Sequence, residues 1–298
     1  FQLPARVHVP GLSSALGRSP NTLVAVRRVL LAQYSPFPSN GADVYEEVLG
    51  STAILSTGNK NLDKLLDSGL YTGELTEFVG APGSGKTQVC LSLAVNISCE
   101  LKQKVVYVDS TGGLSASRLL ELIQSQVDSA EQQTDALQRI EVVRVFDVYG
   151  MLDVLQDLRT SFTQQVGERE RGVKMYFPLG VGVWPIVLGS QVKGERMAIM
   201  MQLARALKTM ARELGVAVVV TNGVVQDMGG GVKPALGRSW SYVPNARVLL
   251  QREAEMGSLQ ETKRSATVLK SSRQVTELHI TGSGTLENQT ATDALDNT

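Results

Sequence analysis

A glycine-rich run carries the clearest chemistry in this chain. Residues 80–87 read Gly-Ala-Pro-Gly-Ser-Gly-Lys-Thr, which fills every fixed position of the phosphate-loop pattern G-x-x-x-x-G-K-[ST]. Glycines let the backbone curl so that successive N–H groups face inward at the positive end of the following helix. Lys86 would reach the β- and γ-phosphates, and the Thr87 hydroxyl would ligate Mg²⁺. The predicted nucleotide-binding residues are Gly80, Ala81, Pro82, Gly83, Ser84, Gly85, Lys86, Thr87 and Gln88.

The segments on either side of this loop support the same interpretation. Residues 74–79 have the pattern of a strand, and residues 88–97 have the pattern of a helix. Strand, loop and helix form the context that a phosphate loop requires. The alternative is a chance match in an ordinary loop, which this context disfavours. The sequence therefore predicts that the chain binds ATP and Mg²⁺.

Strands and helices alternate along residues 75–221. Apolar runs predict strands at residues 75–79, 105–108, 140–146, near 173–177 and at 216–221, and helical periodicity predicts helices at residues 87–101, 115–127, 150–165 and 195–214. Alternation of this kind predicts an α/β fold with a mostly parallel central sheet and helices on both faces. The ligand is then expected at the carboxyl ends of the strands.

Composition describes a globular chain. Of its 298 residues, 43% are hydrophobic, and the formal net charge is zero. No global field therefore draws the chain to nucleic acid or to an anionic membrane. Cys90 and Cys99 lie too far apart along one predicted helix for a disulfide. We interpret both as reduced residues of an intracellular protein. Prolines and glycines interrupt the uncharged run at residues 175–192, which favours a buried strand and loop over a membrane span.

Four segments are expected along the chain. Residues 1–35 contain one predicted helix, about 21–34, which indicates part of a small helical domain. Residues 36–50 form a linker, because the run that opens them is rich in turn formers. Residues 51–281 hold the α/β core, and the polar, aperiodic residues 282–298 form a disordered tail.

Several motifs in the right order resemble the RecA-like strand-exchange recombinases, and among them the paralogues of the eukaryotic Rad recombinase. The segments that carry the resemblance are residues 53–58 (Ala-Ile-Leu-Ser-Thr-Gly), 65–73 (Leu-Leu-Asp-Ser-Gly-Leu-Tyr-Thr-Gly), the phosphate loop, 107–110 (Tyr-Val-Asp-Ser), 219–222 (Val-Val-Thr-Asn), 234–241 (Pro-Ala-Leu-Gly-Arg-Ser-Trp-Ser) and 270–274 (Lys-Ser-Ser-Arg-Gln). The resemblance covers about residues 23–275, apart from a stretch near 175–192. It implies a RecA-like P-loop ATPase core preceded by a remnant of a small helical N-terminal domain.

The resemblance also implies a biological role. Such paralogues act in the nucleus as heteromeric complexes that bind single-stranded or branched DNA and assist recombinase filaments in homologous recombination and double-strand-break repair. Partner paralogues would bind through residues 1–50 and through the ATPase core. Residues 41–47 stand where related recombinases carry a strand that docks on a neighbouring core by β-augmentation. An ordinary solvated linker is the equal alternative at this position.

The resemblance alone assigns contacts with the nucleotide to two further residues. Arg118 stands where a guanidinium lies against the adenine ring, and the alternative is a solvated arginine on the first turn of a helix. Asn222 stands at the position of a polar sensor that points toward the γ-phosphate. Gly223 follows it where relatives carry a longer polar side chain. The family's coupling between nucleotide state and DNA binding is therefore in question here.

Residues 224–240 follow the sensor strand, as the mobile DNA-binding loop does in this family. Gly229, Gly230 and Gly231 give backbone freedom, and Lys233 and Arg238 are the cations that would neutralise phosphates. Because this charge density is low, a surface loop without a DNA role stays open. We interpret Trp240 as a packed core residue rather than a base-stacking platform.

The residues for hydrolysis are incomplete. Thr111 stands where the recombinases carry a water-activating Glu, and no acidic residue lies between Glu170 and Glu195, where the magnesium carboxylate is expected. Asp109 is the preferred substitute, because its strand should lie close to the phosphate loop, whereas Asp147 is expected to cap a helix. Real divergence and an altered exon are both compatible with residues 175–192. The chain is thus expected to be at most a weak DNA-dependent ATPase.

Two alternatives come from other classes. One is a pseudo-ATPase scaffold that bridges recombinase paralogues without touching DNA. The other is a small-molecule kinase, which would need a substrate lid and phosphate-clamping arginines, and the sequence supplies no convincing lid.

Overall fold

The computed structural model describes residues 24, 28, 40–165, 176–180, 193–226, 231–252, 264–271, 277–280 and 286–287. The chain divides into two compact units, Phe1–Gly50 and Ser51–Thr298. Most of the predicted helix at residues 21–34 lies outside the described residues. Val24 and Arg28, its described members, are both helical.

Helix α3 (Gly41–Ser51) belongs to the first unit except for its last residue, Ser51. Asn40 begins this helix, because its Oδ1 accepts a hydrogen bond from the Asp43 N–H at 2.9 Å. The sequence that follows contains Glu46, Glu47 and Leu49, which are good helix formers. An extended docking strand at residues 41–47, one of the two expectations, is therefore wrong for this structure.

A nine-stranded sheet forms the centre of the second unit, in the order β13-β12-β11-β10-β3-β7-β6-β4-β5. From β10 to β5 every neighbouring pair is parallel, whereas β10 to β13 pair antiparallel. The bounds are β3 (Leu75–Gly80), β4 (Val105–Asp109), β5 (Ile140–Arg144), β6 (Tyr176–Gly180), β7 (Ala217–Asn222), β10 (Ala246–Arg252), β11 (Arg264–Lys270), β12 (Glu277–Ile280) and β13 (Leu286–Glu287). The mostly parallel sheet is thus confirmed, and its antiparallel edge includes Leu286 and Glu287 of the predicted tail.

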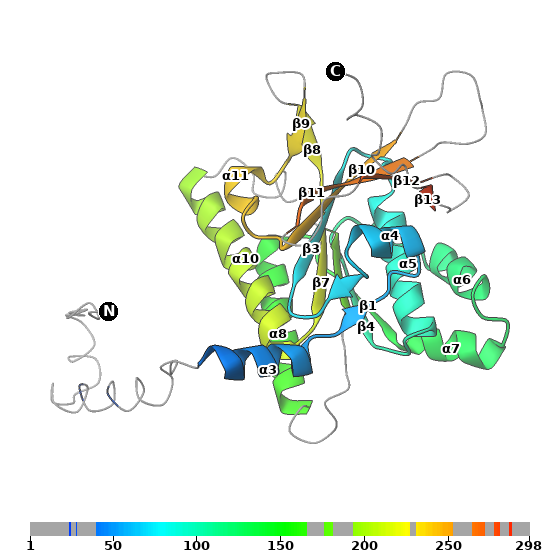
Figure 1. The fold of residues 1–298 in the computed structure, drawn as a ribbon, viewed down its shortest axis with the longest axis horizontal. Helices are drawn as coiled ribbons and strands as arrows, with labels where there is room; N and C mark the ends of the chain where they lie inside the picture. The colour runs from blue at the N-terminus through cyan, green and yellow to red at the C-terminus, as the bar shows by residue number, and fades with distance from the viewer. Residues whose placement is uncertain are drawn as a thin grey trace, which may run out of the picture. The chain divides into compact units, whose positions relative to one another are not determined.

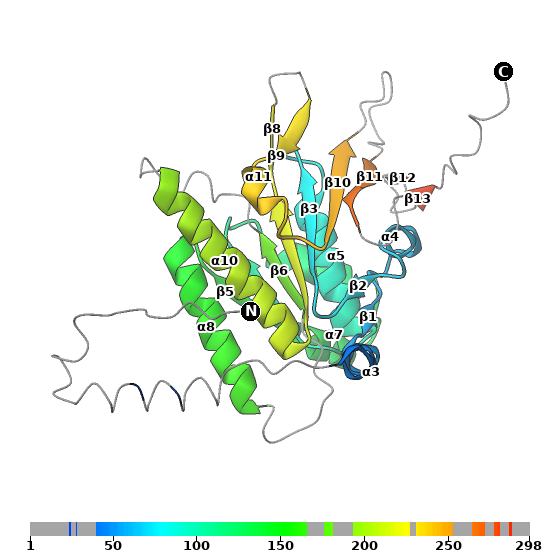
Figure 2. The ribbon, with the colours of Figure 1, turned by 60° about the vertical axis from the view of Figure 1, so that its left-hand side comes forward.

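Helices cover both faces of this sheet (Figure 1, Figure 2). One face carries α5 (Lys86–Cys99), α6 (Ala116–Gln124) and α7 (Ala130–Gln138), and the other carries α8 (Val148–Gln165), α10 (Lys193–Leu214) and the short α11 (Gly237–Trp240). Strands β3, β4 and β7 are buried along their whole length because both faces are covered, and their sequences are mostly apolar, with Glu77 of β3 as an exception. Alternate residues of each strand face opposite layers. Val106 packs with the α8 and α10 layer, and Tyr107 packs with the α5 layer.

Smaller elements complete the second unit. They are β1 (Ile54–Leu55), α4 (Lys60–Leu65), β2 (Leu70–Tyr71), β8 (Val224–Gln226) and β9 (Val232–Pro234). Strands β1 and β2 pair antiparallel, and so do β8 and β9. Within the described ranges, no helix is both long and apolar enough to span a bilayer.

The structure differs from the sequence prediction at two places in the core. The predicted helix 115–127 ends at Gln124, and a second helix, α7, follows; its sequence is mostly polar and buries only Ala136, so it lacks a clear apolar period. Strand β6 begins at Tyr176, within the range predicted near residues 173–177, and extends to Gly180. It pairs with β7 along its whole length but with β4 only at Tyr176 and Leu179. Pro178 has no N–H to donate, which explains the interruption.

Candidate functional site

The phosphate loop joins β3 to α5, so the predicted order of strand, loop and helix is confirmed. Gly83 and Gly85 have φ angles of 78° and 102°, in the left-handed region that favours glycine. A Cβ at Gly80 would lie 2.3 Å from Ser84 Oγ and 2.5 Å from the Leu250 carbonyl oxygen. Only glycine therefore lets the loop fold this tightly against β10.

Lys86 lies over its own loop. Its Nζ donates hydrogen bonds to the carbonyl oxygens of Gly80 at 2.7 Å and Ala81 at 2.9 Å. Burial lowers the pKa of the Lys86 ammonium. Ser84 Oγ is buried against Gly80 and has no hydrogen-bond partner in the described part of the chain. A phosphate at the beginning of α5 would give the Lys86 ammonium a counter-charge, so the loop fits a phosphate chain.

Arg118 lies beside the first turn of α5. Its Nε donates to Gln88 Oε1 at 3.3 Å, and its Nη1 pairs with Glu121 Oε2 at 2.9 Å. Ser115 caps the N-terminus of α6, because its hydroxyl oxygen accepts a hydrogen bond from the Arg118 N–H. This cap holds the backbone of Arg118 in place on the first turn of α6. The structure thus brings together two predicted nucleotide-binding residues, Gln88 and Arg118, from different helices. Stacking of Arg118 on adenine stays a prediction.

Asp109 is a structural residue of its own loop. It is 2% exposed, and its carboxylate accepts hydrogen bonds from the N–H groups of Thr111 and Leu114 at 3.1 Å and of Gly113 at 3.2 Å. Burial acts to raise the pKa of Asp109, but these backbone donors outweigh it, and the pKa lies below its ordinary value. The carboxylate is therefore used to organise the turn after β4.

The reason for preferring Asp109 as a magnesium ligand is wrong. Strand β4 is separated from β3 by β7 and β6, so its end does not adjoin the phosphate loop in the sheet. Strand β6, which lies between β4 and β7, contains no acidic residue within Tyr176–Gly180. Asp147 caps α8, as predicted, because its Oδ1 accepts from the Gly150 N–H at 2.8 Å.

Metal ligands are sparse around the loop. Among the residues with described side chains, no group of three or more His, Cys, Asp or Glu side chains could hold a metal ion. Thr87 is exposed on the first turn of α5, where its hydroxyl is available. Mg²⁺ commonly keeps several waters and binds through substrate phosphates. Thr87 with water and phosphate oxygens therefore fits an ion held mainly by the nucleotide.

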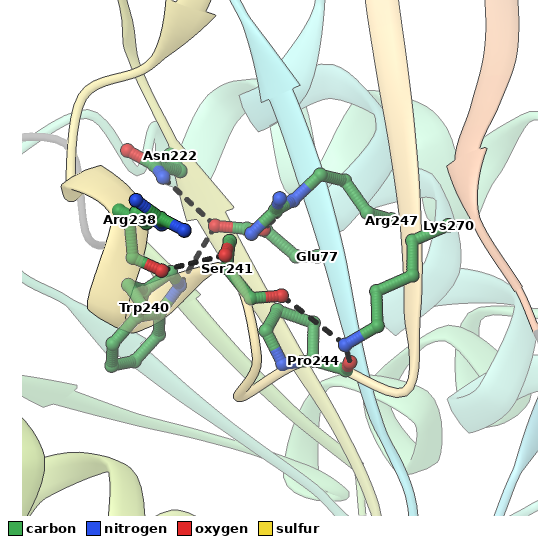
Figure 3. A network of polar contacts seen from close by, with 8 residues as sticks. All are labelled: Glu77, Asn222, Arg238, Trp240, Ser241, Pro244, Arg247 and Lys270. Atoms are coloured by element: carbon green, nitrogen blue, oxygen red, sulfur yellow. Dashed lines mark hydrogen bonds and ion pairs between the residues drawn. The ribbon is translucent and has the colours of Figure 1, made fainter.

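A buried glutamate next to the loop was not predicted from the sequence. Glu77 of β3 is 0% exposed, and its Oε1 accepts hydrogen bonds at 2.8 Å from both Asn222 Nδ2 and Trp240 Nε1 (Figure 3). Its Oε2 accepts from Arg247 Nε in a buried ion pair. The predicted sensor Asn222 thus ends β7 beside Val79 of β3, with its amide nitrogen directed at Glu77. A lone carboxylate inside the apolar run 75–79 was the available signal, because charges in buried strands need partners.

The segment after Asn222 folds into more structure than the predicted loop. Strands β8 and β9 form a hairpin, and α11 follows it. Gly229 and Gly230 lie outside the described residues, whereas Gly231, Lys233 and Arg238 are described and exposed. Trp240 is fully buried at the end of α11, which confirms its expected place in the core. The hairpin lies at the end of the sheet toward which β10 points (Figure 2).

Comparisons with known proteins agree with this architecture. Residues 50–169 match the family model described as Rad51. The "DNA repair protein RAD51 homolog 4" of Mus musculus is 56% identical over 265 residues, which are 88% of this chain and 80% of that protein. The protein of the same name from Bos taurus is 58% identical over 246 residues, covering 82% and 75%. "Probable DNA repair protein RAD51 homolog 4" of Dictyostelium discoideum is 28% identical over 288 residues, covering 85% and 80%.

Proposed function

Because this chain belongs to the Rad51 family, we propose that it is an ATP-binding, DNA-associated subunit of a recombinase-paralogue complex. Its work is in homologous recombination and double-strand-break repair in the nucleus, with weak or absent ATP hydrolysis. The second unit is its RecA-like ATPase core. Its relatives are named as DNA repair proteins, which supports the repair role.

One observation carries the nucleotide part of the proposal. The Lys86 ammonium lies 2.7 Å from the Gly80 carbonyl oxygen, at the positive end of α5, and loop glycines give the backbone its inward curl. Loop N–H groups would hold the phosphates, Lys86 would neutralise them, and Thr87 would hold Mg²⁺. The side chains of Arg118 and Gln88 would lie beside the base of the nucleotide. When a nucleotide is bound, its phosphates carry the negative charge that the loop N–H groups and Lys86 would neutralise.

Weak hydrolysis follows from what the described residues offer. Thr111 is exposed on the turn after β4, and its hydroxyl donates to Asp109 rather than acting as a base. The described part of β6 brings no carboxylate toward the loop. Without a group that orients the attacking water, turnover is expected near the slow intrinsic rate of an unassisted phosphate-loop protein, on the order of 10⁻³ s⁻¹ or below.

The alternative of a scaffold without DNA contact has its own support. Helix α3 exposes an apolar face, on which Tyr45 is 65% and Leu49 is 63% exposed. Partner paralogues would bind to residues 1–50 and to part of the core. A protein interface of this kind does not require DNA contact by this subunit. Two exposed cations, Lys233 and Arg238, are modest support for DNA contact by this subunit itself.

The experiment uses the full chain co-expressed with candidate paralogues. Co-purification is measured first, and ATP turnover of the purified assembly is then followed with and without single-stranded DNA. The proposal expects a stable assembly, retained ATP and turnover no faster than about 10⁻³ s⁻¹ for this subunit. An active assembly whose rapid turnover disappears with Lys86→Ala would contradict weak hydrolysis. An assembly that retains no ATP would contradict nucleotide binding.

A further inference from the structure

An arginine outside the phosphate-loop motif lies directly on that loop. Arg264 is the first residue of β11, and it pairs in register with Arg252, the last residue of β10. Strand β10 runs parallel to β3, with Leu250 beside Gly80. Arg264 therefore lies at the carboxyl edge of the parallel strands, where α/β sheets bind their ligands.

The contact between Arg264 and the loop is close. A Cβ at Gly85 would lie 3.1 Å from Arg264 Nη1, 3.5 Å from its Cδ and 3.7 Å from its Cζ. Gly85 is the residue that precedes α5, with φ at 102°. The guanidinium thus packs on the last glycine of the loop, next to the backbone N–H groups that begin the helix.

Two features at this position indicate an anion. Arg264 Nε is buried and has no hydrogen-bond partner in the described part of the chain. A buried donor without an acceptor destabilises the fold unless a ligand or water satisfies it. In addition, Arg252 and Arg264 are directly opposed on neighbouring strands, and like charges in that arrangement repel each other. A bound anion would accept a hydrogen bond from Arg264 Nε and would offset the repulsion between the Arg252 and Arg264 charges.

We propose that Arg264 binds the phosphate chain of the nucleotide held by residues 80–87 of the same chain. This inference rests on the proposed function, because it takes the occupant to be a nucleoside di- or triphosphate. The planar guanidinium offers several donors to phosphate oxygens in a fixed fork, which an ammonium group does not. Arg264 is thus a binding residue supplied by β11, about 180 residues after the loop.

The test measures equilibrium binding of MgATP, MgADP and AMP to the full chain with its co-purifying partners. Arg264→Ala is expected to weaken MgATP binding by about tenfold or more, and AMP binding by much less, because charge-assisted contacts to the outer phosphates are lost. Arg264→Lys should lie between the wild type and Arg264→Ala. Arg205→Ala, which removes one exposed charge from α10, should bind MgATP like the wild type.

The outcomes separate this inference from the proposed function. If the wild type binds MgATP and Arg264→Ala binds it equally well, Arg264 does not bind the nucleotide, although the phosphate loop does. If the wild type binds no nucleotide, both proposals are wrong. If Arg264→Ala weakens single-stranded DNA binding at unchanged MgATP affinity, the anion is a DNA phosphate and the inference is overturned. Should Arg264→Ala not fold, the comparison of Arg264→Lys with the wild type decides in the same way.

Discussion

Trp240 Nε1 donates a hydrogen bond of 2.8 Å to Glu77 Oε1, which joins the end of α11 to the strand that enters the phosphate loop (Figure 3). The same oxygen accepts from Asn222 of β7, and the other carboxylate oxygen accepts from Arg247 of β10. One buried carboxylate therefore ties together β3, β7, β10 and the segment that follows the β8–β9 hairpin. The predicted nucleotide sensor and the predicted DNA segment meet at this residue.

Neutralising Glu77 is expected to destabilise the fold strongly. Glu77→Gln leaves the Arg247 guanidinium buried without its counter-charge, which costs about 3–5 kcal/mol for a buried pair. Chemical denaturation measures this as a fall in the free energy of unfolding. Glu141→Gln, a matched change at an exposed site on β5, should stay within about 0.5 kcal/mol of the wild type. Equal stability of the two variants would show that the Glu77 network contributes nothing.

The role of Asp109 is tested by the pH dependence of stability. Its folded pKa lies below the ordinary value, so its stabilisation is present above the unfolded pKa of about 3.9 and is lost as the pH falls through the folded pKa. Asp109→Asn should therefore lower stability at pH 7 by about 1–3 kcal/mol. That difference should shrink in acid. Asp128→Asn, at an exposed site, serves as the control.

A magnesium role for Asp109 would give another result. Since β4 lies away from β3 in the sheet, Asp109→Asn should leave the Mg²⁺ dependence of ATP binding unchanged. Loss of Mg²⁺-dependent affinity at unaltered stability would restore Asp109 as the magnesium carboxylate.

Lys233 and Arg238 test the DNA contact. The double variant Lys233→Ala, Arg238→Ala should weaken single-stranded DNA binding and reduce the slope of log affinity against log salt by about two, one for each phosphate contact. Fluorescence anisotropy over a salt series measures both quantities. The control Lys104→Ala, Arg205→Ala removes the same charge from exposed positions elsewhere. If both double variants match the wild type, the DNA site lies on another surface or another subunit.

Much of the fold could be predicted because local sequence carries it. Strands β4 and β7 are mostly apolar runs, β3 departs from such a run only at Thr76 and Glu77, and the phosphate loop is recognisable by spacing alone. Helix α7 was missed because its exposed, polar residues have little apolar period. Helix α3 lies in a segment where turn formers favoured a linker. In each of these cases the local pattern alone was too weak to specify the element.

The contacts around the loop depend on distant parts of the chain. Glu77 meets Asn222, Trp240 and Arg247, which follow it by 145, 163 and 170 residues. Arg264 reaches Gly85 only because β11 returns antiparallel beside β10. Sequence spacing gives no measure of such proximity, whereas the strand order does. The same order shows that Asp109 lies further from the loop than the sequence led us to expect.

The equilibrium dissociation constant of MgATP, compared between the wild type, Lys86→Ala and Lys104→Ala, tests nucleotide binding by the phosphate loop most directly. Lys86 lies over the loop carbonyls of Gly80 and Ala81, whereas Lys104 is exposed outside the loop. Lys86→Ala should weaken binding by about tenfold or more, because a charged donor to the phosphates is lost. Lys104→Ala should bind like the wild type. Equal affinity of all three proteins would contradict nucleotide binding by this loop.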